Sequence, residues 1–250
     1  MQAMIFAAGL GTRLKPLTDT MPKALVKVGG KPLIEHVILN LKAAGAEKIV
    51  VNVHHFAGQI VDFLTSNNNF GIDIRISDES SMLLETGGGI KRAAPLFSSD
   101  KPILIHNVDI LSNVDLRKFY ESNLDNDATL LVSGRVTKRY LLFDDKMSLK
   151  GWTNTSTGEV KMKNGAALLD NGSSFNKFAF SGIHIFTPRL FPLFADYPDK
   201  FGIMDFYLGT GGDVDIKGYL KNDLQLMDVG KLDTLNEAED FLQNLHHSKN

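Results

Sequence analysis

The sequence AAGLGTRLKPLTDTMPKAL, residues 7–25, is the stretch around which the rest of this chain of 250 residues is organised. It follows a short apolar run at residues 3–8, which is typical of a buried strand. The stretch contains two glycines, an arginine, two prolines and two lysines. Glycines let a backbone turn sharply and bring its amides close to phosphate oxygens, and the basic side chains add positive charge. A strand that opens into such a loop predicts a site for a polyanion.

Strand-like and helix-like patterns alternate in the residues that follow. A helical spacing of apolar residues begins after Pro32 and ends near Gly45, and these two residue types suit a first helical turn and a helix end. The same criteria predict strands at 49–53, 72–76, 103–108 and 128–133, and helices at 56–64, 90–94 and 116–124. This alternation predicts an α/β fold in which a mostly parallel sheet has helices on both faces.

The alternation is lost between residues 136 and 177, where glycines, asparagines, threonines and charged residues separate short strand-like pieces around Trp152. A structureless loop of that length is unusual in a compact domain, so we expect hairpins laid over the sheet. The remaining predictions are strands at 178–186, 215–219 and 225–229, a short helix at 188–194 and a final amphipathic helix at 232–245. Because no linker or repeat is visible, we expect residues 1–250 to form a single domain.

Composition restricts the possible classes of function. The chain is 43% hydrophobic and 22% charged, as in ordinary globular proteins, and its 27 basic and 29 acidic side chains argue against a general nucleic-acid surface. The absence of cysteine excludes disulfides and thiolate metal sites. No secretory signal pattern and no apolar run of membrane-spanning length is present, so we expect a cytoplasmic protein without a membrane partner, either a monomer or a small homo-oligomer.

The glycine-rich loop matches neither of the two common phosphate-binding motifs. Leu14 occupies the third glycine position of the dinucleotide fingerprint, and Pro32 stands where a P-loop carries Ser or Thr. Gly9 and Gly11 alone could equally shape a simple turn whose neighbouring charges are solvated. The short glycine pattern therefore leaves both interpretations open.

A wider pattern is more specific. Residues 9–36, GLGTRLKPLTDTMPKALVKVGGKPLIEH, resemble the signature of nucleotidyltransferases that make nucleotide-activated sugars from a nucleoside triphosphate and a sugar 1-phosphate. Similar segments continue along nearly the whole chain: LETGGGI at 84–90, NVDI at 107–110, FSGIHIF at 180–186 and MDVGKLDTLNEAE at 227–239. Val108 departs from the glycine usual in this family. The resemblance implies a Rossmann-like, three-layer fold with a mixed, mostly parallel sheet, of the nucleotide-diphospho-sugar transferase type.

The resemblance also implies roles for residues in two glycine-containing loops. As the catalytic residues, Arg13 would stabilise the leaving pyrophosphate and Lys23 would lie against the α-phosphate and the incoming sugar phosphate. The nucleotide would be bound by Ala8, Gly9, Gly11, Thr12, Arg13, Glu85 and Gly88. The segment TGGG at 86–89 could instead be only a strand-to-helix turn.

The sugar would be bound by Asn107, Ser181 and Gly182, with the region 136–177 lying over it. The last two residues could equally form a β-bulge that has no ligand role. Trp152 could stack on a sugar, although ordinary packing explains an aromatic residue equally well.

Two acidic residues are candidates for a metal site. Asp109 and Asp228 each end a short apolar strand, and the carboxyl ends of strands meet at the ligand crevice of an open α/β sheet. Asp228 could instead cap the final helix. Nucleotidyl transfer brings two polyanions together, so the resemblance implies that both carboxylates hold Mg²⁺.

Within this family the chain most resembles N-acetylmuramate-1-phosphate uridylyltransferases of cell-wall recycling, which implies UTP and N-acetylmuramate 1-phosphate as substrates. A GTP-dependent guanylyltransferase for mannose or heptose 1-phosphate is the alternative within the class. A nucleotide-sugar sensor that binds without turnover is the alternative outside it.

Overall fold

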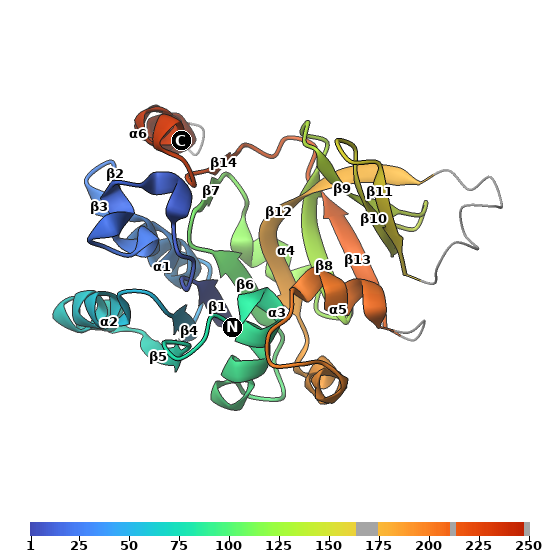
Figure 1. Cartoon of the computed structure of the whole chain (residues 1–250), viewed down its shortest axis with the longest axis horizontal. Helices are drawn as coiled ribbons and strands as arrows, with labels where there is room; N and C mark the ends of the chain where they lie inside the picture. The colour runs from blue at the N-terminus through green and yellow to red at the C-terminus, as the bar shows by residue number, and fades with distance from the viewer. Residues whose placement is uncertain (164–174, 211–213, 248–250) are drawn as a thin grey trace.

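The computed structural model describes residues 1–163, 175–210 and 214–247, and a mixed sheet lies at its centre (Figure 1). The strand order is β11-β10-β9-β12-β6-β1-β4-β5, and β8 joins the sheet beside β12, with β13 paired to β8. Four neighbouring strands of the sheet are parallel: β1 (Gln2–Phe6), β4 (Lys48–Val53), β5 (Asp73–Asp78) and β6 (Ile103–Asn107). Strand β12 (Asn176–Phe186) runs antiparallel to β6.

Helices cover both faces of the sheet because neighbouring strand residues point to opposite sides. Ala3 and Ile5 of β1 belong to one hydrophobic core, whereas Met4 between them belongs to a second core. The first core contains α1 (Leu33–Ala43), α2 (Ala57–Ser66), α4 (Leu116–Glu121) and α6 (Leu232–His247). The second contains α3 (Glu85–Ala93), α5 (Ile203–Gly209) and the 3-10 helix η7 (Pro188–Asp196). The predicted three-layer α/β fold is confirmed.

The predicted antiparallel hairpins are present, but they extend the same sheet beyond β12 and do not lie over it. Strands β9 (Arg139–Phe143), β10 (Leu149–Asn154) and β11 (Glu159–Met162) are antiparallel, and β9 pairs with the first residues of β12. The other half of β12 pairs with β8 (Ala128–Ser133), which is parallel to β13 (Ile216–Leu220). Residues 164–174 of the predicted hairpin region lie outside the described residues.

Several elements differ from the sequence predictions. Helix α3 begins at Glu85 and not at Ile90, so the three glycines lie inside the helix. Glycine has a low helix propensity, and packing against other segments overrides it here. Helix α5, strand β7 (Ile110–Ser112) and the short pair β2 (Lys27–Val28) and β3 (Lys31–Pro32) were not predicted. Strand β7 pairs with β14 (Leu226–Asp228), so its partner lies more than a hundred residues away in the sequence.

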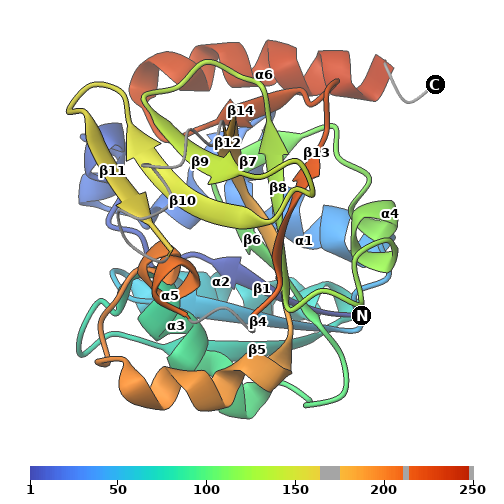
Figure 2. The same ribbon diagram turned by 90° about the vertical axis from the view of Figure 1, so that its right-hand side faces the viewer.

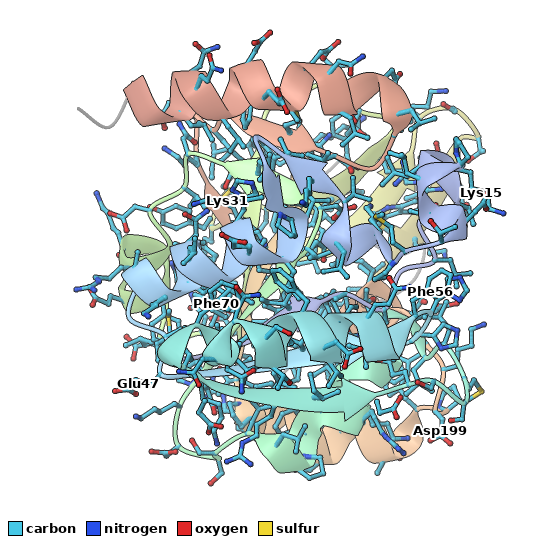
Figure 3. All side chains as sticks on the ribbon, turned by 90° about the vertical axis from the view of Figure 1, so that its left-hand side faces the viewer. Lys15, Lys31, Glu47, Phe56, Phe70 and Asp199 are labelled. Carbon is cyan, nitrogen blue, oxygen red and sulfur yellow. The ribbon has the colours of Figure 1, made fainter. Side chains whose placement is uncertain are left out.

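The loops at the carboxyl ends of the parallel strands gather along one edge of the sheet. Figure 3 shows Lys15, Phe56 and Asp199 along the edge toward which β5 points, and Glu47 at the opposite edge. Lys15 belongs to the loop after β1, and Phe56 follows β4. Ligands of open α/β sheets bind at the carboxyl edge, so this edge is where a site is expected. No helix within the described ranges is long and apolar enough to span a membrane.

Candidate active site

A cavity of about 430 Å³ opens at the carboxyl ends of the parallel strands. Its lining consists of Phe6, Ala7, Ala8, Gly9, Lys23, Asn52, Glu79, Leu83, Glu85, Thr86, Asn107, Val108 and Asp109. Four loops that are distant in sequence contribute to it, and the sheet brings them together. Six residues singled out from the sequence are among these: Ala8, Gly9, Lys23, Glu85, Asn107 and Asp109. The pocket is within the size range of small-molecule sites.

The loop after β1 is folded tightly at Gly11. This residue has φ of +64°, and a Cβ added to it would lie 2.8 Å from Thr18 Cγ2 and 3.1 Å from Lys23 Cβ. The Thr18 hydroxyl donates a hydrogen bond to the Gly11 carbonyl at 2.8 Å. Gly11 therefore brings the loop against Lys23, while Gly9 is exposed at the pocket wall. The structure places Thr12 and Arg13 on an exposed 3-10 turn outside the pocket lining.

A buried polar network that was not predicted from the sequence supports the pocket floor. Asn52, at the end of β4, accepts hydrogen bonds from the backbone N–H of Ala7 at 2.7 Å and of Ala8 at 3.3 Å. Its Nδ2 donates to Glu79 Oε1 at 2.7 Å, and Glu79 Oε2 accepts from the N–H of Leu84 at 3.2 Å. The network ties the first loop to the segment that precedes α3.

Burial explains the electrostatic character of this network. Glu79 is 1% exposed, and burial raises the pKa of its carboxyl, although the hydrogen bonds from Asn52 and Leu84 oppose the shift. The one signal in the sequence was a lone asparagine in the otherwise apolar end of KIVVNV. Nothing in the local sequence indicated that Glu79 would be its partner.

Lys23 is ion-paired with Asp109 at one wall of the pocket. The lysine is 9% exposed, and its Nζ contacts the Oδ2 of Asp109. The family resemblance implies that Lys23 lies against the substrate phosphates, whereas the structure holds it against the carboxylate. The two side chains come from the first loop and from the end of β6, so the pair joins the predicted anion loop to the predicted metal site.

Asp228 joins this cluster through the pairing of β14 with β7. The N–H of Val229 donates to the carbonyl of Asp109 at 2.8 Å, which places the two aspartates side by side. Partial desolvation and then the negative charge of Asp109 raise the pKa of Asp228, while the positive charges of Lys23 and Arg13 oppose that shift. Lys23 and Arg13 thus offset part of the repulsion between the two carboxylates.

The Arg13 guanidinium also lies beside Asp228. A Cβ on Gly230 would lie 2.7 Å from Arg13 Nη2 and 2.6 Å from Asp228 Oδ1, so the missing side chain leaves room for the guanidinium beside the carboxylate. Two cations and two carboxylates from three separate segments thus form one cluster. We call Arg13, Lys23, Asp109 and Asp228 the charged cluster.

The charged cluster supplies two hard oxygen donors, which suits Mg²⁺, because this ion binds one or two carboxylates and completes its shell with water and phosphate oxygens. Within the described residues, no group of three or more histidine, cysteine or acidic side chains is arranged to hold a metal. The residues therefore fit an ion that takes most of its ligands from a phosphate substrate.

The glycines of α3 pack against protein. A Cβ on Gly88 would lie 2.1 Å from the carbonyl oxygen of Asp199, and its N–H donates to the carbonyl of Phe201 at 3.1 Å. A Cβ on Gly87 would lie 2.3 Å from the Phe201 ring. The structure thus does not bring Gly88 to the pocket lining, whereas Glu85 and Thr86 at the start of the helix do line it.

The proposed sugar residues meet at a β-bulge in β12. The register of β12 shifts between Phe180 and His184, and Gly182 has φ of +72°. A Cβ on Gly182 would lie 2.7 Å from Asn107 Nδ2, so the glycine allows β12 to approach the pocket wall. Ser181 is 1% exposed, and its hydroxyl has no hydrogen-bond partner among the described residues. The bulge is present, and Asn107 alone of this trio lines the pocket.

Val108 takes the position of the family's usual glycine without strain. Its backbone is not in the left-handed region, and its N–H donates to the carbonyl of Phe6 at 3.2 Å. The side chain is 4% exposed and adds an apolar surface to the pocket.

Residues 2–140 match a model of a protein family described as nucleotidyl transferase. The chain is 34% identical over 191 residues to an N-acetylmuramate α-1-phosphate uridylyltransferase of Neisseria meningitidis, which covers 76% of this chain and 77% of that protein. The chain belongs to the sugar-1-phosphate nucleotidyltransferase family. It is therefore an enzyme of that class, and the predicted family is confirmed.

Other relatives of this sugar-1-phosphate nucleotidyltransferase differ in the nucleotide they are named for. A uridylyltransferase of the same name from Caulobacter vibrioides is 50% identical over 109 residues, which are 43% of this chain and 45% of that protein. A mannose-1-phosphate guanyltransferase of Gibberella zeae is 36% identical over 138 residues, covering 53% of this chain and 37% of that protein. The first match thus spans less than half of the relative's length.

Solved structures share the fold. A Yersinia pseudotuberculosis protein, HddC, solved in complex with GMP-PN, has a TM-score of 0.75 at 24% identity and covers 96% of this chain and 99% of that one. A glucose-1-phosphate thymidylyltransferase described as putative, from Bacillus anthracis, has a TM-score of 0.78 at 18% identity, with coverage of 98% and 96%.

Proposed function

We propose that this nucleotidyltransferase transfers a uridylyl group from UTP to a sugar 1-phosphate, with N-acetylmuramate 1-phosphate as the first candidate, and releases pyrophosphate. An oxygen of the sugar phosphate forms a bond to the α-phosphorus, and the bond to the β-phosphate oxygen breaks, so that its electron pair leaves with pyrophosphate. The charged cluster at the pocket wall is the observation that carries this proposal. It supports the choice of reaction because such a step needs charge neutralisation more than it needs an acid or a base.

Each member of the charged cluster has a proposed task. Arg13 would neutralise the leaving pyrophosphate from its exposed position, where a guanidinium can contact two phosphate oxygens. Lys23 would approach the α-phosphate and the sugar phosphate once substrate draws it away from Asp109. Asp109 and Asp228 would hold Mg²⁺, which when bound supplies positive charge to the phosphates.

Other residues would position the nucleotide. The exposed backbone at Gly9 would lie against the phosphates or the ribose, and the network of Asn52 and Glu79 would keep the Ala7–Ala8 backbone in place beneath it. Preorganised positioning of two reactants can supply a large part of a rate enhancement.

A GTP-dependent reaction is the second candidate. Its support is the similarity to mannose-1-phosphate guanyltransferases and to a structure solved with GMP-PN. A thermal-shift panel of UTP, GTP, CTP and dTTP with Mg²⁺ separates the two, because a ligand present at about 100 times its Kd stabilises the folded state by about 2.7 kcal/mol. Selective stabilisation by GTP would replace UTP with GTP in our proposal.

Kinetics of the Lys23→Ala variant test the catalytic assignment. We expect the rate of pyrophosphate release from UTP, Mg²⁺ and sugar 1-phosphate to fall by about a hundredfold or more, as for other lost charge-stabilising groups. Lys101→Ala is the matched control, because Lys101 is also paired with a carboxylate, that of Glu47 at 3.6 Å, but at the opposite edge of the sheet. Wild-type kinetics in both variants would remove Lys23 from the reaction.

A further inference from the structure

A second pocket, of about 310 Å³, lies between the hairpin strands, β12 and α5. Its lining includes Arg135, Arg139, Tyr140, Trp152 and Phe180. In Figure 2 the strands β10 and β11 lie above α5 and α3 on the same side of the molecule. We call this cavity the arginine pocket, because two arginines and two aromatic side chains with polar atoms contribute to it.

The arginine pocket adjoins the cavity at the charged cluster along two routes. Phe180 lies two residues before Gly182, which packs on Asn107 of the first cavity. Met204 lines the arginine pocket, and the N–H of the adjacent Ile203 donates to Thr86 Oγ1 of the first cavity at 2.9 Å. Each connection runs through one or two residues, so the two cavities lie next to each other in the fold.

The charges of the arginine pocket are uncompensated within the described part of the chain. Arg135 Nη2 donates to the carbonyl of Phe180 at 2.9 Å, which fixes the guanidinium at the bulge. Neither Arg135 nor Arg139 lies within 4.0 Å of a carboxylate among the described residues. Guanidinium groups bind carboxylates through two parallel hydrogen bonds, so the pocket is suited to an anion.

Aromatic groups beside the arginines suit a sugar ring. Arg139 and Leu141 lie on one face of β9, and Trp152 lies on that face of β10 because it pairs directly with Leu141. The Tyr140 hydroxyl accepts a hydrogen bond from the N–H of Thr137 at 3.0 Å, which holds its ring in place. Aromatic rings with a polar tip bind amphipathic surfaces such as the carbon face of a pyranose.

We propose that Arg135 and Arg139 determine substrate specificity by binding a carboxylate carried by the sugar of the sugar 1-phosphate. The inference rests on the proposed function, because it places the 1-phosphate at the charged cluster and the ring beside Asn107 and Gly182. The part of the sugar remote from the phosphate then reaches the arginine pocket. A neutral sugar leaves both guanidinium groups without an anionic partner, whereas a carboxylate-bearing substituent pairs with them.

A comparison of two sugars tests this assignment. N-acetylmuramate 1-phosphate and N-acetylglucosamine 1-phosphate differ by a lactyl ether that carries the carboxylate. We expect the wild-type enzyme to prefer the acidic sugar, and Arg139→Ala to raise KM for it by about 10- to 100-fold, the range of a lost charge-assisted hydrogen bond. The kcat/KM for the neutral sugar and the Tm stay unchanged. Arg139→Lys keeps the positive charge but loses the planar guanidinium that makes two parallel hydrogen bonds, so we expect its KM for the acidic sugar to lie between those of the wild type and Arg139→Ala.

Lys146→Ala is the matched control, because this exposed cation lies on the β9–β10 turn outside the arginine pocket and its loss changes the net charge equally. Equal use of the two sugars by the wild-type enzyme, or an equal loss for both sugars in Arg139→Ala, overturns the proposal. Stronger competition by glucose 1,6-bisphosphate than by the carboxylate sugar overturns the choice of carboxylate in favour of a second phosphate.

The failure of the proposed function is distinguishable from the failure of this inference. If no sugar phosphate is turned over with any nucleotide, the proposed reaction is wrong, and calorimetric binding of N-acetylmuramate 1-phosphate to the wild type and to Arg139→Ala still decides the role of the arginines. Binding that is equal in the two proteins overturns it, and weaker binding by Arg139→Ala supports it.

Discussion

Replacing Gly88 by alanine tests whether the glycines of α3 serve packing. The added methyl would lie 2.1 Å from the Asp199 carbonyl oxygen and 3.0 Å from Leu84 Cβ, and Asp199 and Leu84 must move to admit it. Overpacking of this kind costs about 1–3 kcal/mol, and the helix propensity that alanine gains in α3 offsets about 0.5–1 kcal/mol of that cost. Each kcal/mol lowers Tm by about 2–4 °C in a protein of this size, so we expect a net decrease of up to about 10 °C.

Gly58→Ala is the matched control. Gly58 also lies in a helix, α2, but a Cβ added to it would have nothing within 4 Å. Alanine there gains about 0.5–1 kcal/mol of helix propensity, so Tm is expected to rise by about 1–4 °C. The same chemical change should thus have opposite signs at the two positions.

Thermal unfolding followed by far-UV circular dichroism measures both variants, and the UTP-induced shift in Tm measures nucleotide binding separately. A Gly88→Ala variant as stable as the wild type, with weaker UTP binding, would refute the packing argument and favour a direct role of Gly88 in binding the nucleotide. Lower stability with an unchanged UTP-induced shift supports packing.

Two further predictions concern buried polar groups. Asn52→Ala removes the hydrogen-bond partner of the Ala7 N–H and of the Glu79 carboxylate, so we expect it to lower the free energy of unfolding by about 2–5 kcal/mol and to weaken nucleotide binding. Urea titrations with and without UTP measure the stability and the binding. Wild-type stability of this variant would contradict a role of the Asn52–Glu79 network in holding the pocket floor. Burial lowers the pKa of His184 from 6.5 to about 3. As the pH drops below 6.5, the histidine therefore takes up a proton in the unfolded state but not in the folded state, and the free energy of unfolding falls. Between pH 7 and pH 5 the wild type should lose about 2 kcal/mol more than His184→Leu, and parallel pH profiles of the two proteins would show that His184 contributes nothing.

Local patterns in the sequence were sufficient to predict the fold class and most of its strands and helices. The β-branched run of β4 and the helical spacing of α1 are set by residues that are neighbours in the chain, so periodicity detects them without tertiary information. The loop predicted to bind a polyanion was equally local, because Gly11 and Lys23 stand within one short segment. The family resemblance, confirmed by the comparisons, extended these patterns to the class of enzyme.

Tertiary structure decided which side chains meet. Asn52 and Glu79, Arg13 and Asp228, and the arginines beside Trp152 come from segments whose proximity depends on strand order and register. The glycines of α3 show the same limit, because a sequence reports that a Cβ is missing but not whether a ligand or a neighbouring carbonyl occupies that space. The sequence by itself determined most of the strands and helices and, through the resemblance, the family; the tertiary structure, by bringing the carboxyl ends of the strands to one edge of the sheet, determined the charged cluster and the pocket beside it.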